Sequence, residues 1–205
     1  MNGTPDEKVN EYTVQNALFY WLRASNVWPI FPNIDCITGF ECDLLAITKA
    51  GFAHEYEIKL SLSDFRADRK KKFKHASLSG RTKVVPHPYY KPPPAHSLYP
   101  ETIVVPQDMN EADSPLLYRA CLHPKRRPRR FCYVVHGFSV PKGELPDYAG
   151  LMTYHPGMIG RQSFTVDRES PNLPSEKVEQ KHLNHAANNM LFRYWHNRTG
   201  MKDGA

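Results

Sequence analysis

The segment ECDLLAITKAGFAHEYEIKL, residues 41–60, constrains the fold more than any other part of the chain. Two runs rich in β-forming residues flank the tripeptide Lys49-Ala50-Gly51. A three-residue hairpin loop with glycine in last place is a favoured geometry, because that position needs a positive φ. Pairing Thr48 with Phe52 then fixes the register of the whole hairpin.

This register places Asp43 opposite Glu57 and Glu41 opposite Lys59. All four side chains lie on one face, because side chains along a strand alternate with a period of two. Two carboxylates facing each other across a hairpin repel by about 3 kcal/mol at an effective dielectric constant near 20. A divalent cation between them relieves the repulsion, and hard oxygen ligands suit Mg²⁺ or Mn²⁺.

Lys59 follows Glu57 by two residues, where its ammonium can orient or deprotonate a water. A divalent ion, a positioned water and a cation form the minimum set for phosphodiester hydrolysis. The hairpin therefore predicts Asp43, Glu57 and Lys59 as catalytic residues, with the metal at the two acids. The alternative, a surface hairpin with ordinary charge pairs, explains Glu41 opposite Lys59 but not two like charges face to face.

The rest of the chain predicts a mixed α/β protein. A capping pattern at Thr4-Pro5-Asp6-Glu7 predicts a helix from there to about residue 25, and residues 27–37 read as an extended strand. Capping residues at 61–64 predict a second helix over 63–79. Residues 81–130 hold ten of the eighteen prolines and read as a long insertion with a short helix near 114–122. Strands are expected at 131–136 and 151–154, and a C-terminal helical tail at 176–198.

Positive charge is concentrated in two segments. Residues 61–80 carry six Lys or Arg against two Asp, and residues 121–130 carry five Lys or Arg and no acid, while the whole chain carries a net charge of +6. Such clustering indicates a polyanion partner, nucleic acid or an anionic membrane surface. A solvated helix face plus a basic loop would show the same pattern, and charge alone does not decide between them.

The order of these residues resembles a known superfamily. Asp43, a hairpin and then Glu57-Ile58-Lys59 match the PD-(D/E)XK pattern of restriction-endonuclease-like nucleases. The longer string EIKLSLSDFRADRKKKFKH, together with FPNI and ECDLLAI upstream, is similar to the MmcB-like branch and to related phage proteins. The similarity covers roughly residues 4–80 and the strands in 131–155. Cys42 stands where the name-giving proline would be.

The resemblance implies one domain over residues 1–205 with an αβββαβ core and a central mixed sheet. The core would comprise residues 4–80 and 131–170, outside the insertion and the tail. It also implies Mg²⁺ bound through Asp43 and Glu57, with Lys59 assisting the attacking water. Glu11 is a candidate for a first-helix metal ligand or a solvated charge, and Glu41 is a second ligand or a plain partner of Lys59.

The implied activity is metal-dependent hydrolysis of DNA in repair, recombination or phage DNA metabolism. The alternatives are a non-catalytic DNA-binding module, an RNA-directed nuclease and a structural phage protein. We expect double-stranded or branched DNA as partner, no membrane association and a place in the bacterial or phage-infected host cytoplasm. Endo- or exonuclease action and oligomeric state, a homodimer among the options, stay open. The expected DNA-binding residues are Ser61, Arg66, Arg69, Lys70, Lys71, Lys74, Arg126, Arg127, Arg129 and Arg130.

Overall fold

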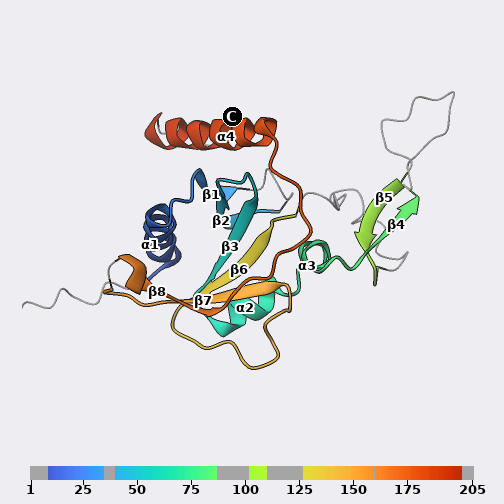
Figure 1. Ribbon diagram of the computed structural model, residues 1–205, viewed down its shortest axis with the longest axis horizontal. Helices are drawn as coiled ribbons and strands as arrows, with labels where there is room; N and C mark the ends of the chain where they lie inside the picture. The colour runs from blue at the N-terminus through green and yellow to red at the C-terminus, as the bar shows by residue number, and fades with distance from the viewer. Residues whose placement is uncertain (1–8, 35–39, 87–101, 110–126, 159, 200–205) are drawn as a thin grey trace, which may run out of the picture.

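A six-stranded mixed sheet forms the centre of the computed structural model, which describes residues 9–34, 40–86, 102–109, 127–158 and 160–199 (Figure 1). The spatial order of the strands is β1-β2-β3-β6-β7-β8. The β3–β6 and β6–β7 pairs are parallel, and the remaining neighbours are antiparallel. The predicted mixed α/β class is confirmed. The strands are β1 (Ile30–Ile34), β2 (Cys42–Ile47), β3 (Ala53–Lys59), β6 (Arg130–Val135), β7 (Ala149–Tyr154) and β8 (Phe164–Arg168).

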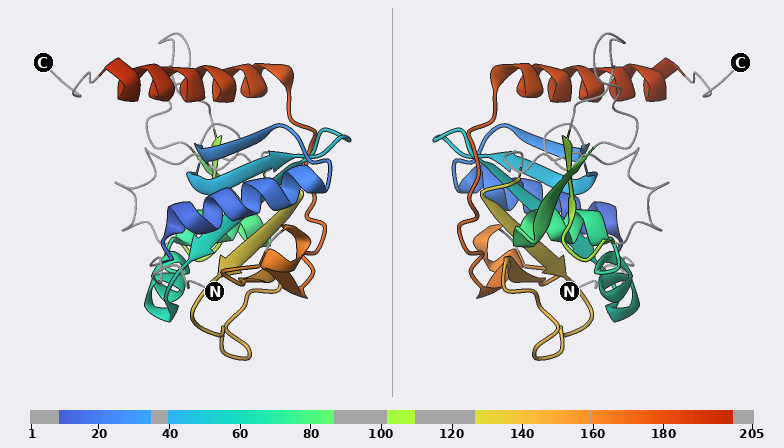
Figure 2. Two further views of the ribbon diagram at one scale, coloured as in Figure 1. Left: turned by 90° about the vertical axis from the view of Figure 1, so that its left-hand side faces the viewer. Right: turned by 90° about the vertical axis from the view of Figure 1, so that its right-hand side faces the viewer.

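Helices cover both faces of this sheet. Helix α1 (Glu11–Ala24) packs on one face, and α2 (Leu62–Asp68) and α3 (Lys72–Ser79) pack on the other (Figures 1 and 2). Helix α4 (Gln180–Thr199) lies across the β1 side, where Ala186 is buried against β1 and β2. In the part of the chain that the structure describes, no helix is long and apolar enough to cross a membrane.

Helix α1 begins later than the sequence predicts. Asn10 caps it by accepting a hydrogen bond of 2.9 Å from the amide of Thr13, so the predicted start at Thr4 is wrong, and Thr4 itself lies outside the described residues. Val14, Leu18 and Leu22 form its buried stripe with at most 1% exposure. This helical spacing of apolar residues holds α1 against the sheet.

The β2–β3 hairpin has the predicted register. The amide of Thr48 donates to the Phe52 carbonyl at 2.9 Å, and Gly51 closes the loop with a φ of +84°. The paired residues run from Ile47–Ala53 to Leu44–Tyr56. The glycine therefore sets the alignment that carries the candidate acids.

The predicted single helix over 63–79 is wrong, because the chain turns between α2 and α3 at Arg69–Lys71. Ser61 caps α2 as expected, accepting from the amide of Asp64 at 3.1 Å. A continuous helix would bring several like charges into repulsive spacing. In the turn, the ammonium of Lys71 lies 2.8 Å from the carboxylate of Asp68.

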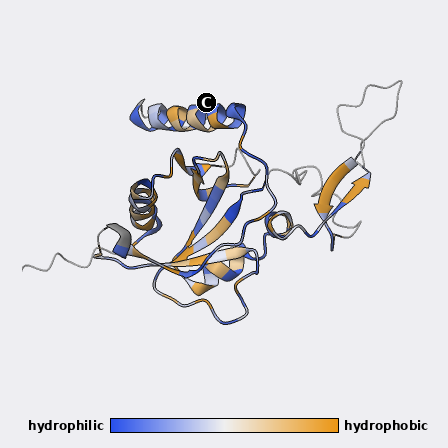
Figure 3. Cartoon of the chain, in the orientation of Figure 1, coloured by the Kyte–Doolittle hydropathy of each residue, from blue (hydrophilic) through white to orange (hydrophobic). Residues whose placement is uncertain are grey.

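The segment predicted as a Pro-rich insertion contains a β-hairpin of its own. Strands β4 (Thr82–Pro86) and β5 (Thr102–Pro106) pair antiparallel and are largely apolar (Figure 3), and β5 contacts α3. The expected helix near 114–122 lies outside the described residues. Sequence reasoning also missed β8, which follows a short 3-10 helix, η2 (Gly160–Ser163).

Candidate active site

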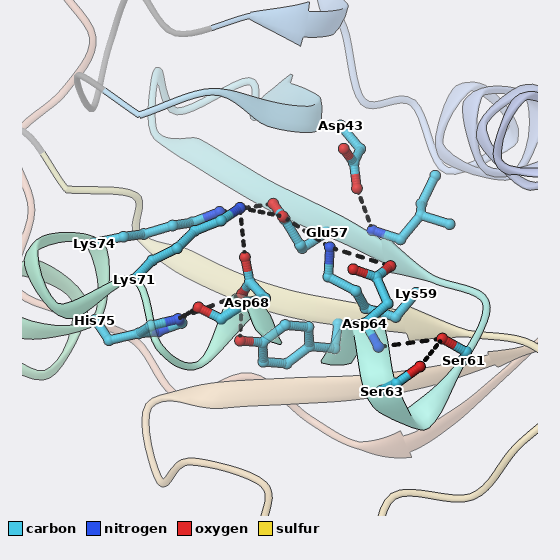
Figure 4. A network of polar contacts seen from close by, with 12 residues as sticks. Asp43, Glu57, Lys59, Ser61, Ser63, Asp64, Asp68, Lys71, Lys74 and His75 are labelled. Carbon is cyan, nitrogen blue, oxygen red and sulfur yellow. Dashed lines mark hydrogen bonds and ion pairs between the residues drawn. The ribbon is translucent and has the colours of Figure 1, made fainter. Parts of the chain in front are cut away.

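The structure brings the three predicted catalytic side chains together. Glu57 and Lys59 project from β3, and Asp43 projects beside them from β2 (Figure 4). The Nζ atom of Lys59 lies 3.1 Å from Oε1 of Glu57 and 3.8 Å from Asp64. Glu57 is 3% exposed and Lys59 is 6% exposed, so these charges interact in a poorly solvated environment.

Asp43 occupies the point where the backbone pairing of β2 and β3 ends. Its Oδ2 atom accepts a hydrogen bond of 2.5 Å from the amide of Ile58. Its carbonyl accepts a 2.5 Å hydrogen bond from the Gln15 side chain, which also donates to Asn33 at 3.0 Å. Gln15 was not singled out from the sequence, where it is only a polar residue on the first helix. It ties α1 to the strand that carries Asp43.

Burial raises the pKa of Asp43 to about 7, and the negative charge of Glu57 adds to the rise. The hydrogen bond from Ile58 and the charge of Lys59 act in the opposite direction without restoring the usual value. The carboxyl group thus lies in poorly solvated surroundings, where the positive charge of Lys59 does not offset burial and the charge of Glu57. This is the electrostatic strain that the predicted hairpin register implies.

Glu57 differs from Asp43 in having three ammonium groups around it. Lys74 lies 2.7 Å from its Oε2 atom, while Lys59 at 3.1 Å and Lys71 at 3.7 Å approach Oε1. Lys74 is 2% exposed, so its predicted place on a DNA-facing surface is wrong. The turn after α2 rotates α3 so that Lys74 faces the sheet.

The charge of Lys74 is stable despite this burial. Burial acts to lower its pKa, but the negative charges of Glu57, Glu55 and Asp68 outweigh that effect and raise it. Glu55 is itself buried, two residues before Glu57 on the same face of β3. The site therefore alternates acids and lysines beneath α3.

Asp68 is a further buried acid of the site that the sequence did not single out. It accepts from the Tyr133 hydroxyl at 2.8 Å and pairs with Lys71 at 2.8 Å. Burial acts to raise the pKa of Asp68, but its partners, with His75 first among them, lower it well below the usual range. The available signal was its place in the string similar to MmcB-like proteins. Asp68 positions Lys71 beside Glu57.

The two additional predicted ligands lie at the margin of the site. Glu11 is exposed in the first turn of α1, and its charge contributes to the raised pKa of Asp43. Glu41 is exposed and precedes β2. Of the two roles considered for Glu41, that of an ion-pair partner of Lys59 is wrong, because Lys59 pairs with Glu57 and Asp64.

Most of the predicted DNA-binding arginines have partners within the protein. Arg66 binds Glu144 through two hydrogen bonds of 2.6 and 2.9 Å, and Arg69 donates to the Glu144 carbonyl. Arg127, Arg129 and Arg130 bind the segment 169–174, through the backbone of Pro174 and Leu173 and the side chains of Asn172 and Glu169. These contacts fasten the chain after β8, and Arg126 lies outside the described residues. Lys70 and Lys71 are exposed.

Asp43 and Glu57 suit a hard divalent cation better than a soft one, because both offer carboxylate oxygens. Asp43 uses Oδ2 for the Ile58 amide, which leaves Oδ1 as the oxygen that would bind a cation. A cation at this point would also offset the burial and the negative charge of Glu57, which together raise the pKa of Asp43. Across the described residues, no group of three or more His, Cys, Asp or Glu could hold a metal. Waters would complete the coordination, as is usual for Mg²⁺.

Comparison with known proteins gives no name for this arrangement. No protein-family model matches the chain, and no curated protein matches it. Among solved structures, the SPO1766 protein of unknown function from Silicibacter pomeroyi is similar, with a TM-score of 0.47 and 14% sequence identity. The match covers 100% of this chain and 98% of that chain. A similarity of this size establishes neither a shared fold nor a shared function.

Proposed function

We propose that this protein is a Mg²⁺- or Mn²⁺-dependent nuclease of the PD-(D/E)XK type that hydrolyses phosphodiester bonds of DNA. The observation that carries the proposal is the convergence of Asp43, Glu57 and Lys59 at the point where β2 and β3 separate. Asp43 and Glu57 hold the metal, and Lys59 positions the attacking water. The resemblance of the sequence to MmcB-like proteins supports a role in repair, recombination or phage DNA metabolism.

The element order supports the same class of protein. Helix α1, the strands β1, β2 and β3, the α2–α3 pair and the parallel strand β6 occur in the expected αβββαβ order, with β4 and β5 inserted before β6. The candidate residues lie on the second and third strands of this series. A hairpin of surface charge pairs would have no need to bury Glu57 and Lys59.

The side chains divide the chemistry among them. The bound metal would polarise the phosphate and lower the pKa of a coordinated water. Lys59 holds its proton, because the negative charges of Glu57 and Asp43 outweigh the effect of burial and raise its pKa. It therefore orients the nucleophile and balances the negative charge that grows on the phosphate oxygens. Lys71 and Lys74 fix the carboxylate of Glu57 from the side of α3.

The structure also offers an observation in favour of a non-catalytic DNA-binding module. Three lysines already neutralise Glu57, and such a pairing can be purely structural. Supercoiled, linear and branched DNA, with RNA in parallel, should be incubated with Mg²⁺, Mn²⁺ or EDTA. The nuclease proposal expects cleavage of DNA in either metal, none in EDTA and none with Asp43→Asn. Metal-independent DNA binding without any cleavage would support the binding module instead.

A further inference from the structure

A cleft lies beside α3, apart from the candidate active site. Its volume is about 890 Å³, and α3, the start of β4, the residues after β5 and the loop 143–148 enclose it. Arg69 lines it from the α2–α3 turn, Lys72 from the first residue of α3, Arg81 from the residue before β4, and Tyr148 from the loop. None of the predicted catalytic residues lies in its wall.

The cleft is suited to an anionic ligand. Three basic side chains line it, those of Arg69, Lys72 and Arg81, against the two acids Asp108 and Asp147. Lys72 and Arg81 are exposed, so phosphate oxygens could reach them. Guanidinium groups are well matched to phosphate, because they present several donors in one plane.

The positive charges of two arginines act on the hydroxyl of Tyr148, which lines this cleft. Burial raises the pKa of the Tyr148 hydroxyl, and the positive charges of Arg69 and Arg81 both oppose the rise. Arg69 comes from the α2–α3 turn and Arg81 from the residue before β4. The positive charge is thus gathered around Tyr148 from two sides.

The cleft and the candidate active site both border the α2–α3 turn. Lys71, the last residue of the α2–α3 turn, points to Glu57, while its neighbour Lys72, the first residue of α3, lines the cleft. The Nε2 atom of His75 lies 2.8 Å from the Asp68 carbonyl, and its Nδ1 atom is hydrogen-bonded to the Tyr148 hydroxyl. A chain of polar contacts therefore runs from Tyr148 through His75, Asp68 and Lys71 to Glu57. Figure 4 shows the part of this chain from His75 to Glu57.

We propose that this cleft binds the sugar–phosphate backbone of a single-stranded DNA segment that continues from the phosphodiester held at Asp43 and Glu57. The inference rests on the proposed function and narrows its substrate to DNA with an unpaired stretch, such as a flap or a branch. The volume is that of a small-ligand pocket, which suits one or two nucleotides rather than a duplex. A positive groove with an aromatic residue is the usual form of a single-strand site.

The test measures binding of fluorescent oligothymidylate in EDTA, where no cleavage occurs. Lys72→Gln and Arg81→Gln should each weaken affinity about fivefold, and the double variant should lower the slope of log affinity against log salt by about 1.4. Lys142→Gln is the matched control, because Lys142 is exposed next to Gly143 of the cleft but does not line it. It should leave affinity and slope unchanged. Binding of a blunt hairpin duplex should respond little to any of these changes.

Three results would overturn the inference. They are an equal loss of affinity in Lys142→Gln, an equal loss for the blunt duplex, and thymidine monophosphate competing as well as the oligonucleotide. The last would make the cleft a site for small phosphate compounds. Failure of the nuclease proposal is distinguishable, because a protein that cleaves nothing can still bind single strands through Lys72 and Arg81. If the protein cleaves DNA while Lys72→Gln and Arg81→Gln bind the oligonucleotide as tightly as wild type, the nuclease proposal stands. The proposal that the cleft binds single strands is then wrong.

Discussion

The Nζ atom of Lys74 lies 2.7 Å from Oε2 of Glu57, and both side chains are almost completely buried. This pair changes what the hairpin alone predicts for its two acids. Burial and the charge of Glu57 raise the pKa of Asp43, whereas three ammonium groups surround Glu57 itself. The two proposed metal ligands should therefore respond in opposite ways when each is neutralised.

Glu57→Gln should abolish metal-dependent cleavage and also destabilise the fold. It leaves the ammonium of Lys74 buried without its closest partner, and breaking a buried ion pair costs about 3 kcal/mol at the lower end of measured values. The lower end applies because the negative charges of Glu55 and Asp68 still stabilise the ammonium of Lys74. Urea unfolding at neutral pH measures the change. Adding Lys74→Met to Glu57→Gln should restore much of the loss, and a Glu57→Gln variant as stable as wild type would mean that the pair is not buried in solution.

Asp43→Asn should also abolish cleavage, but it should stabilise the metal-free protein. The folded-state pKa of Asp43 is raised to about 7 from its usual value of 3.8. Between these values the folded protein holds a proton that the unfolded chain has released, so wild-type stability falls as the pH rises to about 7. Asn removes this dependence and still accepts from the Ile58 amide.

The gain from Asp43→Asn should thus be small at about pH 5 and on the order of 2 kcal/mol at about pH 8, after allowance for the partial exposure of the group. Urea unfolding in EDTA at the two pH values measures it. Mg²⁺ should stabilise the wild type at the higher pH and leave Asp43→Asn unaffected. A gain that is equal at both pH values would show that the pKa of Asp43 is not raised.

The hairpin was predictable because its determinants are local. Gly51 sets the loop, and the alternation of side chains then fixes which residues share a face. Asp43, Glu57 and Lys59 could be assigned to one site on that basis alone. The start of α1 was not predictable, because two capping patterns, at Thr4 and at Asn10, compete in the same segment.

The surroundings of Glu57 could not be predicted, because they depend on partners distant in sequence. A run of basic residues reads as a solvated helix face, and only packing on β3 reveals that Lys74 is buried. Asp68 depends on Tyr133, which lies 65 residues further along the chain. The guanidinium of Arg129 likewise has its partner 44 residues away, at the Leu173 carbonyl. Contacts between residues so far apart in the sequence leave no periodic pattern from which they could be predicted.

Lys70 and Lys74 should separate DNA contact from packing. Lys70 is exposed in the α2–α3 turn. Lys70→Gln should therefore lower the slope of log affinity against log salt by about one unit for duplex DNA. Lys74→Gln should leave the slope unchanged and reduce stability. The comparison needs only anisotropy titrations at several salt concentrations and one unfolding curve per variant. Equal effects on the slope would show that Lys74 faces solvent when DNA is present.

Lys59 distinguishes an enzyme from a binding module. Burial acts to lower its pKa, but the charges of Glu57, Asp43 and Asp68 raise it above the usual value, so Lys59 is a protonated group that places and polarises a water. Lys59→Ala should retain or tighten Mn²⁺ binding, because a positive charge next to the metal ligands is removed. The cleavage rate should fall by two or more orders of magnitude, the scale of losing one preorganised electrostatic group.

DNA affinity measured in Ca²⁺ should change little in Lys59→Ala, since one cation among many phosphate contacts contributes modestly. Lys59→Arg is the matched variant, because it keeps the charge while altering the geometry of the donors. It should bind Mn²⁺ as wild type does and recover part of the lost rate. Normal cleavage by Lys59→Ala together with much weaker DNA binding would make Lys59 a contact residue, and the division of roles among Asp43, Glu57 and Lys59 would then be wrong.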